Sequence, residues 1–243
     1  MTTTRIPASF QIATIALLGA ALIAGGSASA LAAGKPVHTY TAAPSQTAKT
    51  TVTAQSLNYE SSLVSVKARI PVIRGMKDAR YQAELNDIIA RHAAEDIELL
   101  KQVARVDYAK AKKGGYPFHK YELVIDYAVH ANTSGILSFE LETYRSYDRG
   151  DRIDAYNVKD GAAASRMTLA DLFGENYETV VNEAIRAQIA KKANAAVYAF
   201  EGISAEPTFY IEGKQAIVVF QKYEIAPGSE GAQSFAIAIP QGE

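Results

Sequence analysis

The chain has 243 residues, no cysteine and a formal net charge of −1 at pH 7. This near-neutral charge gives no electrostatic reason to expect a nucleic acid or an anionic membrane surface as a partner, and the lack of cysteine excludes both a disulfide framework and a lipid anchor on a cysteine. The length suits one large domain or two smaller subdomains that share a core.

The first 33 residues have the pattern of an export signal. Arg5 supplies the positive charge, residues 12–23 form a short apolar run, and small residues at 28–32 offer cleavage sites. The apolar run is shorter than the roughly 20 residues of a spanning helix. We therefore expect cleavage and an exported protein, periplasmic or secreted, with no stable membrane insertion; an uncleaved anchor is the alternative. Residues 34–55, rich in Thr, Ala, Ser and Pro, are interpreted as a linker.

The folded part begins with a strand and a long helix. Apolar and polar residues alternate over residues 64–70, which predicts a half-buried strand that stops at Pro71. An amphipathic helix is predicted over residues 77–109, ended by Gly114 and Gly115. The predicted apolar face of this helix holds Tyr81, Leu85, Ile88, Ile89, His92, Ile97, Leu100 and Val103.

A long antiparallel hairpin is predicted next. Alternation over residues 119–131, up to Val129, indicates its first strand, the polar residues 132–135 its turn, and residues 137–141 its return strand. A short strand is predicted at residues 155–158. Thr168 then caps a short helical turn at residues 169–173, with Asp171 in the capping-box position, and a second helix follows over residues 177–192.

The last part of the chain predicts three strands, over residues 209–211, 217–225 and 235–239. The order of strands and helices, with mostly hairpin connections, predicts an α+β fold in which antiparallel sheets pack with two main helices. We expect two subdomains that share a core, over residues 56–160 and 161–243.

A motif in these last strands resembles a known family. The motif consists of F-x-x-Y-E-I-A-P, a glycine four residues later, and F-x-I-x-I-P. Its residues are Phe220, Tyr223, Glu224, Ile225, Ala226, Pro227, Gly231, Phe235, Ile237, Ile239 and Pro240. With L-A-D-L-F at residues 169–173, they resemble the RsiV-like extracytoplasmic domain family, a domain of unknown function found in lysozyme-sensing anti-sigma factors and beside peptidoglycan deacetylases. The resemblance implies an envelope location and a lysozyme- or peptidoglycan-related partner.

The chain departs from this family in two places. Residues 147–151 stand where the family commonly carries a G-G-A-H-G-like segment. Only the first eleven residues precede the apolar run, too few for a cytoplasmic sigma-binding domain. We therefore expect that this chain is not itself a transmembrane anti-sigma factor.

The chemistry-bearing residues do not form a recognised catalytic or metal motif. His119 and His130 lie at opposite ends of one predicted strand, about 36 Å apart, so they cannot share a metal. Asp148, Asp151 and Asp154 alternate with arginines and lack the spacing of a calcium loop. No nucleophile elbow or zinc signature is found. We expect no metal, no cofactor and no enzymatic activity.

Two groups of residues are nevertheless singled out. Tyrosine and arginine gather at one hairpin end, a composition suited to protein or glycan contact, although strand propensity explains the tyrosines nearly as well. This candidate binding surface comprises Tyr144, Arg145, Tyr147, Arg149, Arg152 and Tyr156. The second group is a predicted structural turn made by Tyr223, Glu224, Pro227 and Gly231.

Within the turn, Tyr223 and Ile225 are expected to continue a buried strand face, and Gly231 to adopt a positive φ. Glu224 is expected to accept N–H groups of the loop at residues 228–231, with a catalytic carboxylate as the alternative.

The sequence thus predicts an exported, non-enzymatic binding or sensor module of the cell envelope. Its predicted partner is an envelope protein or a peptidoglycan fragment. The alternative is an accessory or enzyme that acts on envelope glycan, associated with a hydrolase or deacetylase.

Overall fold

The computed structural model describes residues 49–133, 135–148 and 151–240. The expected export signal, most of the expected linker and Arg149 lie outside these residues. The described residues all belong to one compact unit.

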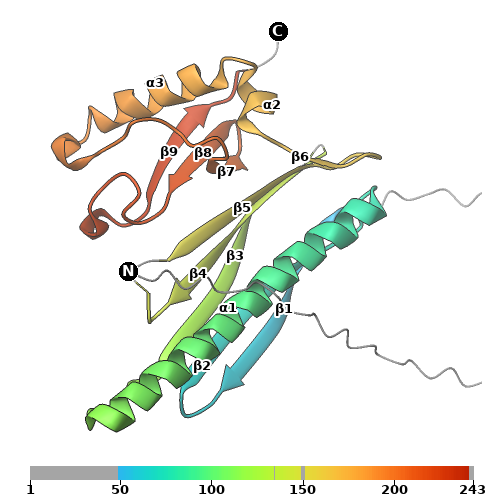
Figure 1. Ribbon diagram of the computed structural model, residues 1–243. Helices are drawn as coiled ribbons and strands as arrows, with labels where there is room; N and C mark the ends of the chain where they lie inside the picture. Colours follow the sequence, from blue (N-terminus) through green and yellow to red (C-terminus); the bar gives the residue numbers. More distant parts are fainter. Residues whose placement is uncertain (1–48, 134, 149–150, 241–243) are drawn as a thin grey trace, which may run out of the picture. The chain divides into compact units, whose positions relative to one another are not determined.

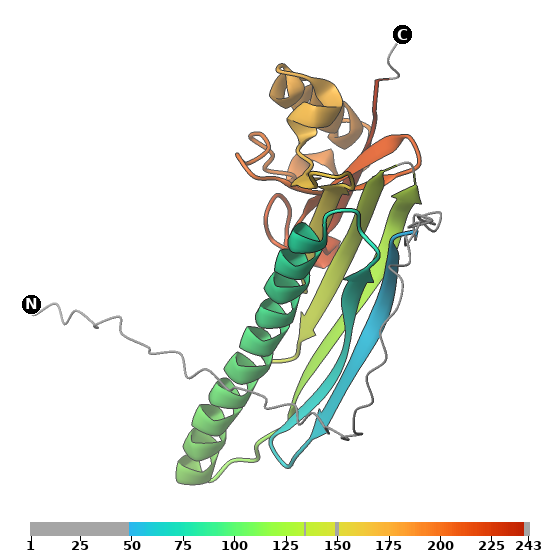
Figure 2. The same ribbon diagram turned by 90° about the vertical axis from the view of Figure 1, so that its right-hand side faces the viewer.

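The first half of this unit is a six-stranded mixed sheet with a long helix on one face (Figures 1 and 2). In spatial order its strands are β1 (Thr51–Glu60), β2 (Val64–Arg74), β3 (Tyr121–Thr133), β4 (Ile136–Arg145), β5 (Arg152–Lys159) and β6 (Ser165–Arg166). Neighbours are antiparallel except β2 and β3, which run parallel because helix α1 (Ala79–Gly114) crosses between them.

Two sequence predictions for the start of the sheet are wrong. β1 begins at Thr51, so residues 51–55 belong to a strand and not to the linker; most of β1 is exposed on both faces, which removes the alternation that marks a strand. β2 continues through Pro71. The pairing of β2 with β3 ends at Ala68, so the missing proline N–H interrupts no ladder on that side.

Helix α1 is fixed at both ends by the expected chemistry. The Asp78 carboxylate accepts the backbone N–H of Arg80 and Tyr81, at 3.1 and 3.0 Å, and Gly115 ends the helix with a φ of 69°. The buried face steps from Ile89 to Ala93, so His92, predicted on that face, is exposed. The exposed part of the helix also includes Ile88, Leu99 and Val106.

The second half of the unit has its own sheet and core. Its antiparallel strands are β7 (Thr208–Glu212), β8 (Gln215–Phe220) and β9 (Gln233–Ala238), and its helices are α2 (Leu169–Phe173) and α3 (Tyr177–Ile189). Short 3₁₀ turns lie at η1 (Ala195–Val197) and η2 (Gly228–Glu230). The capping box of Thr168 and Asp171 is present as predicted, and apolar residues of α3 pack on the sheet.

A buried polar network joins the two halves. Ser138 on β4 donates to Asn157 on β5 (2.7 Å), and Asn157 donates to the carbonyl of Phe209 on β7 (2.6 Å). The Ile211 N–H donates to the Ser138 hydroxyl (2.8 Å). Each buried donor and acceptor named here has a partner, as burial requires. The predicted α+β class with two main helices is confirmed.

Candidate binding site

The predicted tyrosine–arginine surface is divided between two faces of the sheet. Cross-strand pairing places Thr143 opposite Arg152 and Phe139 opposite Tyr156, on the face that packs against α1. Tyr144 is one residue out of step with Thr143, so it lies on the other face, where it is 43% exposed. The five described members of this group therefore do not form one continuous patch.

Asp96 of α1 is the residue that organises the helix-facing part of this group. The Arg152 guanidinium donates to both Asp96 oxygens, at 3.0 and 2.7 Å, and Arg145 lies 3.7 Å from the same carboxylate. Asp96 is only 5% exposed. Although burial lowers the pKa of Arg152, the hydrogen bonds and charges of Asp96 and Asp154 raise it above its ordinary value. These ion pairs hold α1 on β4 and β5.

The two helix-facing tyrosines are also bound into the fold. Tyr156 stacks on Phe139, with ring centroids 5.1 Å apart, and burial followed by the Asp154 charge raises its pKa to about 12. Tyr147 packs beside Tyr121, with ring centroids 5.7 Å apart, and burial raises the pKa of Tyr147. Both side chains contribute to packing of the core. Sequence composition alone does not distinguish such packing tyrosines from tyrosines that contact a partner.

The predicted structural turn differs in two contacts from the sequence interpretation. Tyr223 is 56% exposed with a φ of 74°, so it does not continue a buried face, whereas Ile225 is buried. Glu224 accepts the backbone N–H of Gln221 (2.6 Å) and is exposed, so its carboxylate caps a tight turn next to it in sequence and not the loop at residues 228–231. Pro227 has a φ of −56° and Gly231 a φ of 71°.

An apolar groove between β1 and α1 is the more open candidate site. It has a volume of about 440 Å³ and is lined by Leu57, Asn58, Tyr59, Ile70, Ala90, Ala94, Ile97, Glu98 and Lys101. Ala90 and Ala94 lie one turn apart on the helix, and their small side chains leave the space open. Leu57 and Tyr59 on the β1 side are 38% and 45% exposed. The sequence did not predict this groove, because no strand was predicted over residues 56–60, which hold Leu57, Asn58 and Tyr59.

One end of the groove is polar. The Lys101 ammonium donates to Glu98 (2.7 Å) and lies 5.3 Å from the centre of the Tyr59 ring. A second cavity of about 190 Å³ shares Tyr59 and Lys101 with the groove and adds Arg105 and the β1–β2 turn. The combined surface offers an apolar trough with cationic groups at one end.

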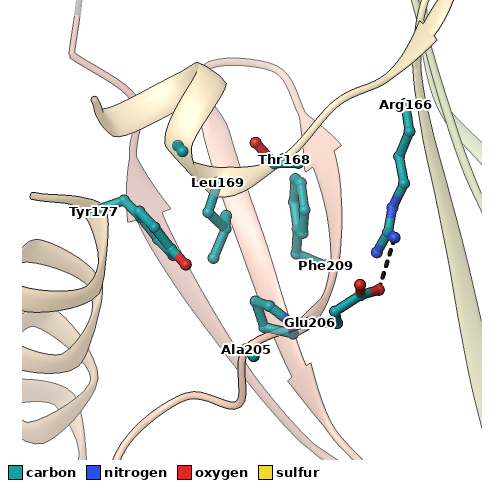
Figure 3. Close-up of a pocket in the computed structure, with 9 residues that line it drawn as sticks. Arg166, Thr168, Leu169, Tyr177, Ala205, Glu206 and Phe209 are labelled. Carbon is teal, nitrogen blue, oxygen red and sulfur yellow. Dashed lines mark hydrogen bonds and ion pairs between the residues drawn. The ribbon is translucent and has the colours of Figure 1, made fainter. Parts of the chain in front are cut away.

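A smaller cup lies between α2, α3 and β7 (Figure 3). Its volume is about 220 Å³; Leu169 and Phe209 form the apolar floor, and the ring of Tyr177 forms one wall. On the other side, Arg166 donates to Glu206 (2.7 Å). These two residues are the charged members of the lining, and they neutralise each other at the exposed rim of the cup.

Two kinds of feature are absent from the described part of the chain. Within residues 49–133, 135–148 and 151–240, no three His, Asp or Glu side chains come together as a metal site. No helix in that part of the chain is long and apolar enough to cross a membrane.

Two family models match the chain, one in each half. Residues 57–147 match the family described as deacetylase PdaC, and residues 170–239 match a protein family of unknown function, DUF3298. The first match covers β1 from Leu57 onward, α1 and the β3–β4 hairpin, and therefore includes the groove.

Known proteins are similar to this chain over more than three quarters of its length. The anti-sigma-V factor RsiV of Bacillus subtilis is 24% identical over 199 residues, which cover 76% of this chain and 67% of the relative. A DUF3298 family member from Bacteroides fragilis has a similar structure, with a TM-score of 0.61, 13% identity and coverage of 79% of this chain and 91% of the neighbour. A DUF3298 family protein from Pseudomonas aeruginosa has a TM-score of 0.50 and 12% identity, with coverage of 78% of this chain and 89% of the neighbour. These structural likenesses establish a shared fold.

Proposed function

Because the sequence matches and the shared fold support an RsiV-like domain family for this chain, we propose that it is an exported, non-enzymatic binding or sensor module of the cell envelope. The observation that carries the proposal is the similarity to an anti-sigma factor over 199 residues, which cover 76% of this chain. Export rests on the signal pattern in the first 33 residues.

The groove between β1 and α1 is the proposed contact site, and a lysozyme-type protein is the proposed partner. Its lining is mostly apolar and offers few hydrogen-bonding groups, a composition that suits protein side chains better than a glycan, whose hydroxyls need many polar partners. The partly exposed Leu57 and Tyr59 would lose water on contact, which favours association.

The hairpin end predicted from sequence remains a proposed secondary contact. Tyr144 is its most accessible described member, while Arg145, Tyr147, Arg152 and Tyr156 are partly buried against α1 and its neighbours. Contact there would therefore depend chiefly on Tyr144.

A glycan-directed role is the second candidate, favoured by the match of residues 57–147 to the family described as deacetylase PdaC. Under this alternative the chain would bind a peptidoglycan fragment or act on it, alone or beside a hydrolase or deacetylase. The two candidates differ in the ligand that binds and in whether product forms.

Isothermal titration of residues 34–243 with lysozyme and, separately, with soluble peptidoglycan fragments tests the proposal. We expect lysozyme binding that Ala94→Trp, which fills the groove, weakens at least about tenfold, while Ala187→Trp on the exposed side of α3 leaves it unchanged. Equal affinities for the two variants would place contact elsewhere. Binding of fragments without lysozyme binding, or release of acetate or reducing ends, would favour the glycan alternative.

A further inference from the structure

The free edge of β1 is the feature from which a further inference follows. β1 is an edge strand of the six-stranded sheet, and all ten of its residues pair with β2 on one side. Among the described residues no strand pairs with its other side. One row of backbone N–H and C=O groups along a ten-residue strand therefore faces outward.

This edge lacks the features that usually protect an exposed edge. Natural edge strands are shortened, bulged, or carry lysine or proline that oppose pairing with another chain. β1 has the sequence TVTAQSLNYE, with no lysine, arginine, proline or glycine, and its single charge, Glu60, stands at the end. Its pairing with β2 runs without a register shift, so no bulge turns the edge away. The edge is long, regular and almost uncharged.

We propose that β1 is a self-association edge, on which the β1 strands of two copies pair antiparallel about a two-fold axis. An antiparallel edge is complementary to itself, because each copy presents the same donors and acceptors in reverse order. Nine of the ten β1 residues carry no charge, and the chain as a whole is near neutral, so two copies meet little repulsion. The two sheets then form one continuous sheet.

This pairing also completes the groove. The groove is bounded by α1 on one side and by the α1-facing side of β1 on the other, and beyond β1 the sheet ends. The two-fold axis of an antiparallel pair stands perpendicular to the sheet, so both α1 helices lie on the same face. The β1 strand of the second copy would extend the floor beside Leu57 and Tyr59. This inference rests on the strand edge and not on the proposed partner.

Analytical ultracentrifugation of residues 34–243 over a range of concentrations up to about 1 mM tests the proposal. We expect a reversible monomer–dimer equilibrium. The edge variant carries Ala54→Lys and Gln55→Lys, at two positions that do not line the groove. Because it places four lysines near the two-fold axis of the dimer, its dissociation constant should be at least about tenfold higher than that of the parent. The charge-matched control, Ala83→Lys with Ala187→Lys on exposed helix positions, should dimerise like the parent.

Circular dichroism melts separate misfolding from lost association, and hydrogen exchange locates the contact. At high concentration the amides of residues 51–60 should gain protection in the parent and not in the edge variant. If the parent stays monomeric at every concentration, the proposal is wrong, whether another strand covers the edge or the edge stays unpaired. Dimerisation that the edge variant retains overturns it as well. Loss of lysozyme binding with dimerisation intact would count only against the proposed function.

Discussion

Asp96 is the residue on which the attachment of α1 to β4 and β5 depends most. Replacing it with asparagine leaves Arg152 and Arg145 partly buried without this shared carboxylate, and removing one partner of a buried ion pair typically costs about 3 to 5 kcal/mol. Because the arginines retain some solvent, we expect Asp96→Asn to lower the free energy of unfolding by about 3 kcal/mol, measured by urea denaturation.

Asp87→Asn is the matched control for Asp96. Asp87 forms an exposed ion pair with Arg91 one helical turn away (3.4 Å), so its loss should cost less than about 0.5 kcal/mol. Similar losses for both variants would show that the buried pair is not a special contact.

Tyr156 should make the protein sensitive to alkaline pH. Its pKa is raised to about 12, mainly by burial, against an ordinary value of 10. Below pH 10 the phenol is neutral in both states, and between pH 10 and 12 it ionises chiefly in the unfolded chain, so stability falls as pH rises. Allowing for partial exposure, the loss is about 1 to 2 kcal/mol.

Chemical denaturation at pH 9 and pH 11.5 measures this effect. Tyr156→Phe should show a smaller loss than the parent between the two values. Tyr116→Phe, at a 55% exposed position, should lose as much as the parent. An unchanged loss in Tyr156→Phe would contradict the assignment.

Tyr223 should reverse the usual order of glycine and alanine. Its φ of 74° is unfavourable for any residue with a Cβ by about 1 to 2 kcal/mol, and its exposed ring contributes limited burial. We expect Tyr223→Gly to be more stable than Tyr223→Ala by about 1 kcal/mol in thermal or urea unfolding. Greater stability of the alanine variant would mean that the turn relaxes its backbone.

At the scale of elements, the contact between the two sheets should depend on Ser138 and Asn157 together. Their hydrogen bonds to each other, to the Phe209 carbonyl and to the Ile211 N–H are buried, so either truncation strands a partner. Ser138→Ala and Asn157→Ala should each cost about 1 to 3 kcal/mol. A double-mutant cycle should give a coupling of about 0.5 to 3 kcal/mol; additive costs would show independent bonds.

Elements with strong local signals could be predicted from the sequence. The long helix, the capping box of Thr168 and the terminal strands have periodicity or end signals that act over a few residues. β1 was partly missed because it is exposed on both faces and therefore does not alternate. Val129 continues the alternation of its strand and pairs with the buried Phe139, yet it is 41% exposed, so alternation alone did not show where the cover of the sheet ends.

The site depended on contacts that sequence spacing does not encode. Asp96 meets Arg152 across 56 positions of the chain, so nothing local marks it as the partner of the predicted arginines. The groove requires β1 and α1 side by side, and their placement follows from the β2–α1–β3 crossover. Charge and aromatic content identified a hairpin end, whereas packing decided which of its side chains stay accessible.

At the scale of the whole molecule, the two halves have separate cores and a shared polar contact, and similarity to the anti-sigma-V factor covers 76% of the chain. The groove lies in the first half, whereas the motif that indicated the family lies in the second. The motif that indicated the family and the proposed contact site thus lie in different parts of the chain.

Hydrogen exchange with and without lysozyme tests whether a protein partner occupies the β1–α1 groove. The measurement uses the Ala54→Lys and Gln55→Lys variant, so that pairing of β1 strands does not contribute to protection. We expect slower exchange over residues 57–59 and 90–101 when lysozyme is bound. Protection confined to the α2–α3 cup, or no change at saturating lysozyme, would contradict it.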